Sequence, residues 1–149
     1  CWQDDVLTVR LAGARAAVAA ARAKLGGEFI DQGAAFWEAL RQHRCDFFAS
    51  DDALPRLSVP SIAPPLDLPG EQIIEWGGSL RWVNTQTDAQ TVRDLTARHG
   101  GHATAFKGAQ AGVPVFTPAS SAHLAIQQRL KDAFDPAHIF NIGRLYPQY

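Results

Sequence analysis

The sequence predicts an α+β fold, a ferredoxin-like split βαβ antiparallel sheet with helices on one face. One observation is a phrase of strand, helix, Gly-Gly and strand that occurs twice, around Gly26-Gly27 and around Gly100-Gly101. The other is Gly77-Gly78, which lies between two alternating segments. Glycine readily adopts the positive φ angles that two-residue hairpins need, so a hairpin is expected there.

The first phrase begins at residue 5. Residues 5–11 alternate between apolar and polar side chains, which is typical of a half-buried strand. An alanine-rich stretch follows, with Val18 and Leu25 at helical spacing, and Gly26-Gly27 is expected to end this helix. Residues 28–31 are then expected to form a short second strand.

The middle of the chain is expected to contain a helix over 34–48 and a strand over 56–59. Four prolines follow between Pro60 and Pro69. Because proline lacks a backbone donor and fixes φ, this stretch predicts an extended connector rather than a helix.

The second phrase starts with the hairpin strands, over 72–76 and 79–84. Thr87 and Gln90 have the spacing of a capping box and are expected to open a helix that closes at His99. A strand over 102–106 completes the phrase. A last helix is capped by Ser120 or Ser121, and Asp135-Pro136 ends it.

Composition indicates an ordinary globular domain. Hydrophobic residues make up 46% and charged residues 19%, and the net charge is −1. This balance gives no electrostatic reason to expect a nucleic-acid partner. Two cysteines are too few for a disulfide scaffold, so a reducing, cytosolic setting is the default. The chain lacks methionine and begins at Cys1, and we expect it to be a piece of a longer protein.

Several motifs indicate no chemistry of their own. His99 and His102 are separated by a glycine pair and have no clustered carboxylates or cysteines nearby, so no metal site is expected. Cys45 lacks a base within reach and is interpreted as a small buried hydrophobe. The glycine-rich loop 107–112 lacks the spacing of a phosphate cradle and is interpreted as a connector.

The hairpin around Gly77-Gly78 is one candidate site. Alternation places Trp76 and Trp82 on one side, and Glu75 and Arg81 on the other. Aromatic faces with a guanidinium can receive a flat ring or a small carboxylate. A well-packed hairpin with a cross-strand ion pair explains the same residues equally well.

The segment 134–144 is a second candidate. A helix that stops at Asp135-Pro136 and leads into Phe-Asn-Ile-Gly-Arg places the Asn141 amide and the Arg144 cation on a tight turn. Such a turn can hydrogen-bond a ligand, although turns of this composition are common.

These residues resemble a known family. Residues 135–144 are similar to the closing signature of FAD-linked oxidases of the vanillyl-alcohol oxidase type. Three further phrases, at residues 56–60, 74–82 and 115–118, resemble the FAD-binding subunit of bacterial glycolate oxidase. The likeness runs in order from Arg56 to Pro147 and covers only the C-terminal domain of such a subunit.

The resemblance implies a role for each matching residue. Residues 1–133 would form the ferredoxin-like cap domain on the substrate side, and residues 134–149 would return to a flavin-binding domain that this chain lacks. Asn141, Gly143 and Arg144 would contact or support FAD. Arg56, Trp76 and Arg81 would face the flavin, the substrate or a partner subunit.

The resemblance also implies a reaction, the oxidation of glycolate or another short 2-hydroxyacid to the 2-oxoacid through FAD. The fragment alone would be inactive. Partners would be a second flavin subunit and an iron–sulfur subunit. The protein would be cytoplasmic, and it would associate peripherally with the inner membrane only through the complex.

Two departures from the family's pattern bear on these roles. Ile142 stands where the family usually has proline, which removes a preset φ and adds a backbone donor. The chain also lacks the His-Gly-Asp-Gly-Asn-x-His stretch of the paired flavin subunit, which leaves open which of the two subunits oxidises the substrate.

Two alternatives come from other classes. The fold also serves small-molecule-binding regulatory domains, because fold does not fix function. A subunit-docking module would instead use the tryptophans and the proline-rich connector to bind another chain. RNA binding is not expected, because the sequence lacks the aromatic motifs that bind RNA on this sheet topology.

Overall fold

The computed structural model describes residues 1–109 and 112–147. It contains a six-stranded antiparallel sheet in the order β2-β1-β4-β5-β3-β6. The predicted α+β class and antiparallel sheet are therefore confirmed. The strands are β1 (Trp2–Gln3), β2 (Val6–Leu7), β3 (Leu54–Ser58), β4 (Glu71–Glu75), β5 (Leu80–Asn84) and β6 (His102–Lys107). The helices are α1 (Arg15–Leu25), α2 (Gly33–Arg41), α3 (Ala89–Arg98) and α4 (Ser121–Phe134), with 3₁₀ turns η1 (Asp46–Ala49) and η2 (Trp76–Gly78).

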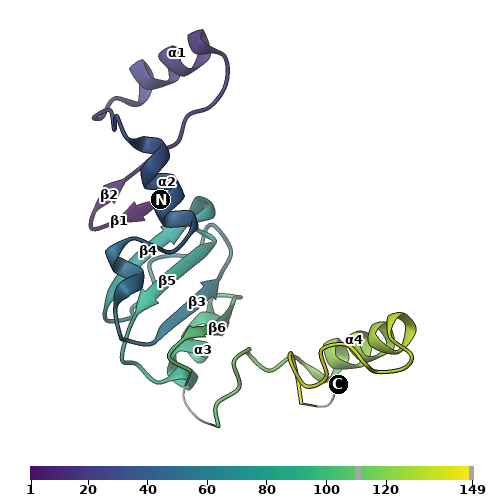
Figure 1. The fold of residues 1–149 in the computed structure, drawn as a ribbon. Helices are drawn as coiled ribbons and strands as arrows, with labels where there is room; N and C mark the ends of the chain where they lie inside the picture. The colour runs from purple at the N-terminus through teal and green to yellow at the C-terminus, as the bar shows by residue number, and fades with distance from the viewer. Residues whose placement is uncertain (110–111, 148–149) are drawn as a thin grey trace.

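The split βαβ topology is built from the last four strands (Figure 1). β5 lies between β3 and β4, and β3 lies between β5 and β6, with every neighbouring pair antiparallel. The connection from β5 to β6 contains α3, and the connection from β3 to β4 is the proline-rich segment 59–70. One of the two crossover helices of a split βαβ sheet is thus replaced by an extended connector.

The prediction of a first βαβ unit near the N-terminus is wrong. Within residues 5–11 only β2 forms, and it is an exposed two-residue strand. Residues 28–31 form no strand. The helix between them is present as α1, but none of its residues is buried. Alternation and helical spacing identified local segments, whereas no neighbouring surface supplies the burial that a second βαβ unit requires.

The helix predicted over 34–48 is two shorter elements. α2 ends at Arg41, and η1 begins at Asp46. Between them His43 has a φ of 53°, a left-handed conformation that stops an α-helix. The break turns the chain so that Phe47 and Phe48, both in η1, reach the sheet.

The helices cover both faces of the sheet, so the prediction of helices on one face is wrong. Alternation along β5 sends Trp82 to one face and Val83 to the other. α2 and η1 cover the first face, which we call the Trp82 face. Its core comprises Leu40, Phe47, Phe48, Leu54, Ile73, Leu80 and Trp82.

α3 and the connector cover the opposite face, which we call the Val83 face. Its core comprises Leu57, Val59, Leu66, Leu68, Val83, Val92 and Ala103. Leu66 and Leu68 come from the connector, so the proline-rich segment packs against the sheet where a helix would otherwise lie. This segment forms no helix, as predicted, but it contains a turn in which the Ala63 amide donates to the Pro60 carbonyl oxygen at 2.8 Å.

Arg81 fastens the connector to the sheet. Its side chain is 3% exposed, and its three nitrogens donate to the carbonyl oxygens of Gly78, Pro64 and Ala63 at 3.2, 2.6 and 2.6 Å. Burial lowers the pKa of Arg81 from its ordinary value. Proline residues lack a backbone donor, so the proline-rich connector has few amides of its own, and this guanidinium supplies donors to its Ala63 and Pro64 carbonyl groups.

The turn between β4 and β5 is longer than predicted. Glu75 pairs with Leu80, so four residues connect the strands instead of the two glycines alone. Trp76, Gly77 and Gly78 all have positive φ angles, of 50°, 63° and 100°. A side chain at Gly78 would also meet the Ser61 carbonyl oxygen at 2.7 Å, so glycine is required there.

α3 and α4 begin at side-chain caps. Asp88 accepts hydrogen bonds from the Gln90 and Thr91 amides at 3.1 and 3.0 Å, so this aspartate rather than Thr87 opens α3. A hydrogen bond from the Thr91 side chain, together with these backbone bonds, lowers the pKa of Asp88. Ser120 caps α4, as expected.

α1 and α4 stand apart from the sheet at opposite ends of the molecule (Figure 1). Neither helix has a buried residue. The apolar side of α4 exposes Ile126, Leu130 and Phe134. No helix among the described residues is both long and apolar enough to cross a membrane.

Replacing Arg81 with Met is expected to lower the free energy of unfolding by about 2–4 kcal/mol, because buried carbonyl groups lose their donors. Urea denaturation followed by circular dichroism measures this loss. The matched control is Arg56→Met on the other face, which breaks no hydrogen bond and is expected to cost less than about 1 kcal/mol. Equal losses for the two variants would contradict this role of Arg81.

Candidate functional site

The structure brings two of the predicted site residues together and separates the others. Arg56 on β3 and Trp76 in η2 lie in contact on the Trp82 face. Arg81 is buried on the opposite face and is committed to the connector. Asn141, Gly143 and Arg144 lie in the exposed turn after α4.

The Arg56 guanidinium lies against two indole rings. Its central carbon is 5.6 Å from the centroid of Trp76 and 5.8 Å from that of Trp82. Both are cation–π contacts. Arg56 is half-buried, and within the part of the chain that the structure describes its side chain has no hydrogen bond and no ion pair. A guanidinium held by its faces leaves its N–H edge available for an acceptor.

Further rings surround Trp82. Phe106 on β6 lies 4.9 Å from Trp82 between centroids, and His43 lies 5.0 Å from it, both near edge-on. The Phe106 side chain is half exposed, and the His43 side chain is exposed, so this part of the face is open to solvent. We call Arg56, Trp76, Trp82, Phe106 and His43 the Arg56 cluster.

Glu75 fixes the central indole of the cluster. The Trp82 Nε1 atom donates to a carboxylate oxygen of Glu75 at 3.0 Å. Glu75 therefore lies with Trp82 and not with Arg81, so the predicted pairing of Glu75 with Arg81 is wrong. The pairing of the strands is the reason. Glu75 pairs with Leu80, so its side chain lies on the face that Leu80 shares with Trp82, whereas Arg81 pairs with Ile74 and lies on the other face.

Cys45 lies at the edge of the core beneath this cluster. It is partly buried and packs against the core of the Trp82 face. Burial raises the pKa of the Cys45 thiol, and the carboxylates of Asp46 and Glu75 add smaller effects in the same direction. A raised pKa keeps the thiol protonated and unreactive, which agrees with its interpretation as a packing residue.

The Arg56 cluster can bind a small carboxylate. A guanidinium with a free edge forms paired hydrogen bonds to a carboxylate, and the two indoles hold it in place for this. The open aromatic surface can also cover one side of a flat ring.

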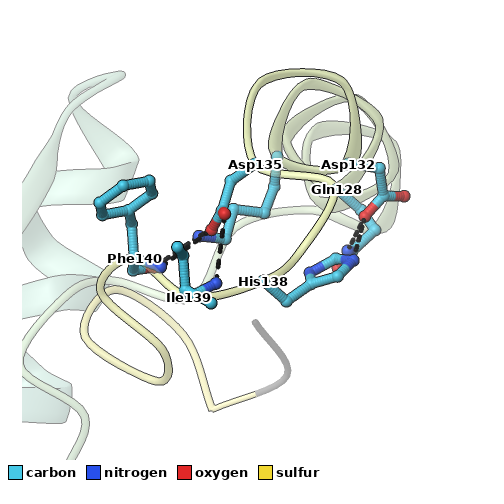
Figure 2. A network of polar contacts seen from close by, with 7 residues as sticks. Gln128, Asp132, Asp135, His138, Ile139 and Phe140 are labelled. Carbon is cyan, nitrogen blue, oxygen red and sulfur yellow. Dashed lines mark hydrogen bonds and ion pairs between the residues drawn. The ribbon is translucent and has the colours of Figure 1, made fainter.

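The turn after α4 is organised by Asp135 (Figure 2). Its carboxylate accepts hydrogen bonds from the amides of Ile139 and Phe140 at 3.2 and 3.0 Å. Lys131 forms an ion pair with the same carboxylate and also donates to the Phe140 carbonyl oxygen. One carboxylate and one cation thereby fold the chain back against the end of α4.

The signature residues project from this turn. Asn141 and Gly143 have positive φ angles of 50° and 67°, and the Arg144 amide donates to the Asn141 carbonyl oxygen at 3.1 Å. All three residues are exposed. The geometry confirms a tight turn here, and the role of its side chains toward a flavin remains a prediction.

The structure indicates no functional role for two other features of the sequence, the histidine pair and the glycine-rich loop. Among residues 1–109 and 112–147 no cluster of His, Cys, Asp or Glu could hold a metal ion. The glycine-rich loop 107–112 includes residues 110 and 111, which lie outside the described residues. Its first residue, Lys107, donates to the Ser50 carbonyl oxygen and lines a pocket between β6 and α3, together with Arg93.

The described residues fit one part of FAD better than another. The Arg56 cluster offers an aromatic, cationic surface suited to the side of the isoalloxazine ring. The N-terminus of α3 is already filled by the Asp88 carboxylate, so it offers no site for the diphosphate.

The fold and the cluster define a class, an α+β domain whose antiparallel sheet presents an open aromatic and cationic face. The particular relationship comes from comparison with known proteins. The chain is 40% identical over 148 residues, 99% of its length, to Glycolate oxidase subunit GlcE from Escherichia coli (strain K12). It spans 41% of that relative's length.

No protein-family model matches the sequence. No solved structure matches it either. The resemblance to a bacterial glycolate oxidase subunit, predicted from residues 56–147, is confirmed, and it extends to the N-terminal part where only the fold pattern indicated it.

Sequence reasoning missed His43 and Phe106 as members of the cluster. Phe106 lies on the predicted strand 102–106, and its alternation with Thr104 could have placed it on the face of Arg56, given the pairing of β3 with β6. His43 had no such signal, because its position depends on the break between α2 and η1.

Lowering the pH is expected to release the turn after α4 only in strong acid. The Lys131 ammonium and the two amides hold the pKa of Asp135 at about 2, below its ordinary 3.8. A depressed carboxyl pKa stabilises the turn above the ordinary value and loses this effect as the pH falls toward the depressed value.

Chemical shifts of the Ile139 and Phe140 amides, followed by NMR from pH 6 to about pH 1, measure this transition. The Lys131→Met variant is expected to move the midpoint upward toward the ordinary carboxyl value. An unchanged midpoint in that variant would show that Lys131 does not lower this pKa.

Proposed function

We propose that this chain is the substrate-side domain of an FAD-linked glycolate oxidase subunit. The observation that carries the proposal is the unpartnered Arg56 guanidinium between Trp76 and Trp82. The 40% identity to a glycolate oxidase subunit supports the reaction class. The substrate is glycolate or another short 2-hydroxyacid, and the product is the 2-oxoacid.

Arg56 binds the substrate carboxylate in this proposal. Arg81 donates to backbone carbonyls from each of its three nitrogens and is buried, so it is not accessible to a ligand. Arg56 has kept its edge free at half burial, where a charge-assisted hydrogen bond is stronger than in bulk water. In this proposal Arg81 therefore has a structural role, and Arg56 binds the substrate.

The Trp82 face covers the flavin ring and shapes the space for substrate. FAD supplies the electron-accepting chemistry when it is bound, and the protein contributes orientation and electrostatics. Asn141, Gly143 and Arg144 support the flavin from the turn after α4, so that residues 134–149 act as a returning segment; residues 148 and 149 lie outside the described part of the chain. In this proposal the FAD diphosphate binds to a part of the longer protein that this chain does not span, so this chain alone binds FAD negligibly and is inactive.

Other subunits complete the oxidase in this proposal, namely a second flavin subunit and an iron–sulfur subunit. The name of the relative, a glycolate oxidase subunit, supports assembly with further chains. The protein is cytoplasmic, and the complex provides any peripheral association with the inner membrane.

Subunit docking is a second candidate function, favoured by the exposed apolar side chains of α4 and the turn after it. Phe134 is 85% exposed, and Ile139 and Ile142 are 66% and 68% exposed. Monomeric proteins rarely expose such a cluster. Of the tryptophans and the connector, Trp82 and the connector leucines are buried, whereas Trp76 and Ile62 are 71% and 92% exposed.

Replacing Arg56 with Lys in the complete protein is expected to lower kcat/KM for glycolate by about 10²-fold. Lysine keeps the charge but cannot reproduce a planar, paired hydrogen-bonding edge between two indoles. Steady-state kinetics of the assembled oxidase measures the loss, while bound FAD is followed by its visible absorbance.

The matched control is Arg98→Lys, at an exposed arginine of α3 on the Val83 face. It should leave both readings unchanged. Normal turnover by Arg56→Lys with full FAD content would refute the proposed substrate role of Arg56.

A further inference from the structure

His43 occupies a position that normally favours glycine. α2 ends in a Schellman turn, in which the His43 amide donates to Leu40 O at 3.1 Å and the Arg44 amide donates to Ala39 O at 2.8 Å. His43 is the left-handed residue of this turn, with a φ of 53°. A side chain with a Cβ is disfavoured in this conformation, so the imidazole stands here against the local backbone preference.

The turn directs the imidazole onto the Trp82 face. Its ring centroid lies 5.0 Å from Trp82, 5.1 Å from Phe106 and 4.5 Å from Phe48. The His43 side chain is nevertheless exposed, and it makes no hydrogen bond with any other residue of the described chain. Its ring nitrogens are thus available to hydrogen-bond a ligand.

His43 and Arg56 contact the same indole. Trp82 is 5.0 Å from the His43 ring and 5.8 Å from the Arg56 guanidinium, and the Glu75 carboxylate holds its Nε1 atom. One fixed ring therefore positions a free cation and a free imidazole on an open face of the sheet. A 2-hydroxyacid has complementary groups, a carboxylate for the cation and a neighbouring hydroxyl whose proton must leave.

We propose that His43 is a catalytic residue that accepts the proton of the substrate's 2-hydroxyl group. The inference rests on the proposed function, because it takes the ligand of Arg56 to be a 2-hydroxyacid. The O–H bond breaks and its proton moves to a free nitrogen of the His43 imidazole. The carbonyl forms as the C2–H bond breaks, and the hydrogen leaves with its electron pair for the bound FAD, which is reduced.

The strain at His43 makes a clean test possible. In His43→Gly the backbone conformation is relieved while the imidazole is lost, so the variant should unfold cooperatively near the wild-type temperature. In the complete FAD-loaded oxidase its kcat for glycolate should fall by about 10²- to 10³-fold, with KM changed by less than about 3-fold. Added imidazole should restore at least about a tenth of the lost rate.

The control variant is His99→Gly, at the C-terminal cap of α3 on the other face, which should keep the wild-type rate and should not respond to imidazole. A wild-type kcat in His43→Gly would overturn the inference. A reduced kcat that imidazole does not restore, in a variant with lowered thermal stability, would also overturn it, because the loss would then be structural.

Binding of oxalate, an unreactive dicarboxylate, provides a readout independent of turnover. Quenching of the tryptophan fluorescence of the complete protein should report it, and His43→Gly should keep the wild-type Kd within about 3-fold. Arg56→Lys should weaken binding by about 10-fold or more.

The two variants distinguish the two hypotheses. If Arg56→Lys loses both oxalate binding and turnover while His43→Gly has a normal kcat, the proposed function stands and the role of His43 is refuted. If both variants bind oxalate normally and turn over normally, both hypotheses are refuted.

Discussion

Burial of β5 on both faces is the constraint on which the structure depends. All five of its residues are buried, and they alternate between the two cores. A strand in this position requires cover on both sides of the sheet. α2 and η1 supply it on the Trp82 face, and α3 with the proline-rich connector supplies it on the Val83 face. Each neighbouring strand is then placed by its register with β5 or with β3.

The same alternation separates two arginines that have opposite roles. Arg81 points into the Val83 face, where three carbonyl oxygens accept its hydrogen bonds. Arg56 points to the other face, where two indoles hold a guanidinium whose N–H edge has no partner in the described chain. A buried cation needs acceptors within the protein, whereas a half-buried cation on an open face can bind a ligand from solution. Because side chains alternate between the two faces of the sheet, one arginine has a structural role and the other is part of the candidate site.

α1 and α4 do not pack against the sheet. Both helices form from local preference and their ends, yet neither buries a residue. Isolated helices of this length are marginal in water, and most helices gain stability from packing an apolar face. The turn after α4 is held instead by polar contacts, the Asp135 carboxylate with two amides and Lys131. The apolar side chains around this turn remain exposed in this chain.

The sequence by itself determined the elements whose signals are local. Alternation located β5, four prolines located the extended connector, and Ser120 located the start of α4. It also indicated Arg56 and Trp76 through resemblance. The tertiary structure decided which partner each side chain has, since the pairing of Glu75 with Leu80 places Glu75 beside Trp82, and burial commits Arg81 to the connector. The physical reason is that register, helix breaks such as that at His43, and burial depend on contacts between distant segments, which no local pattern encodes.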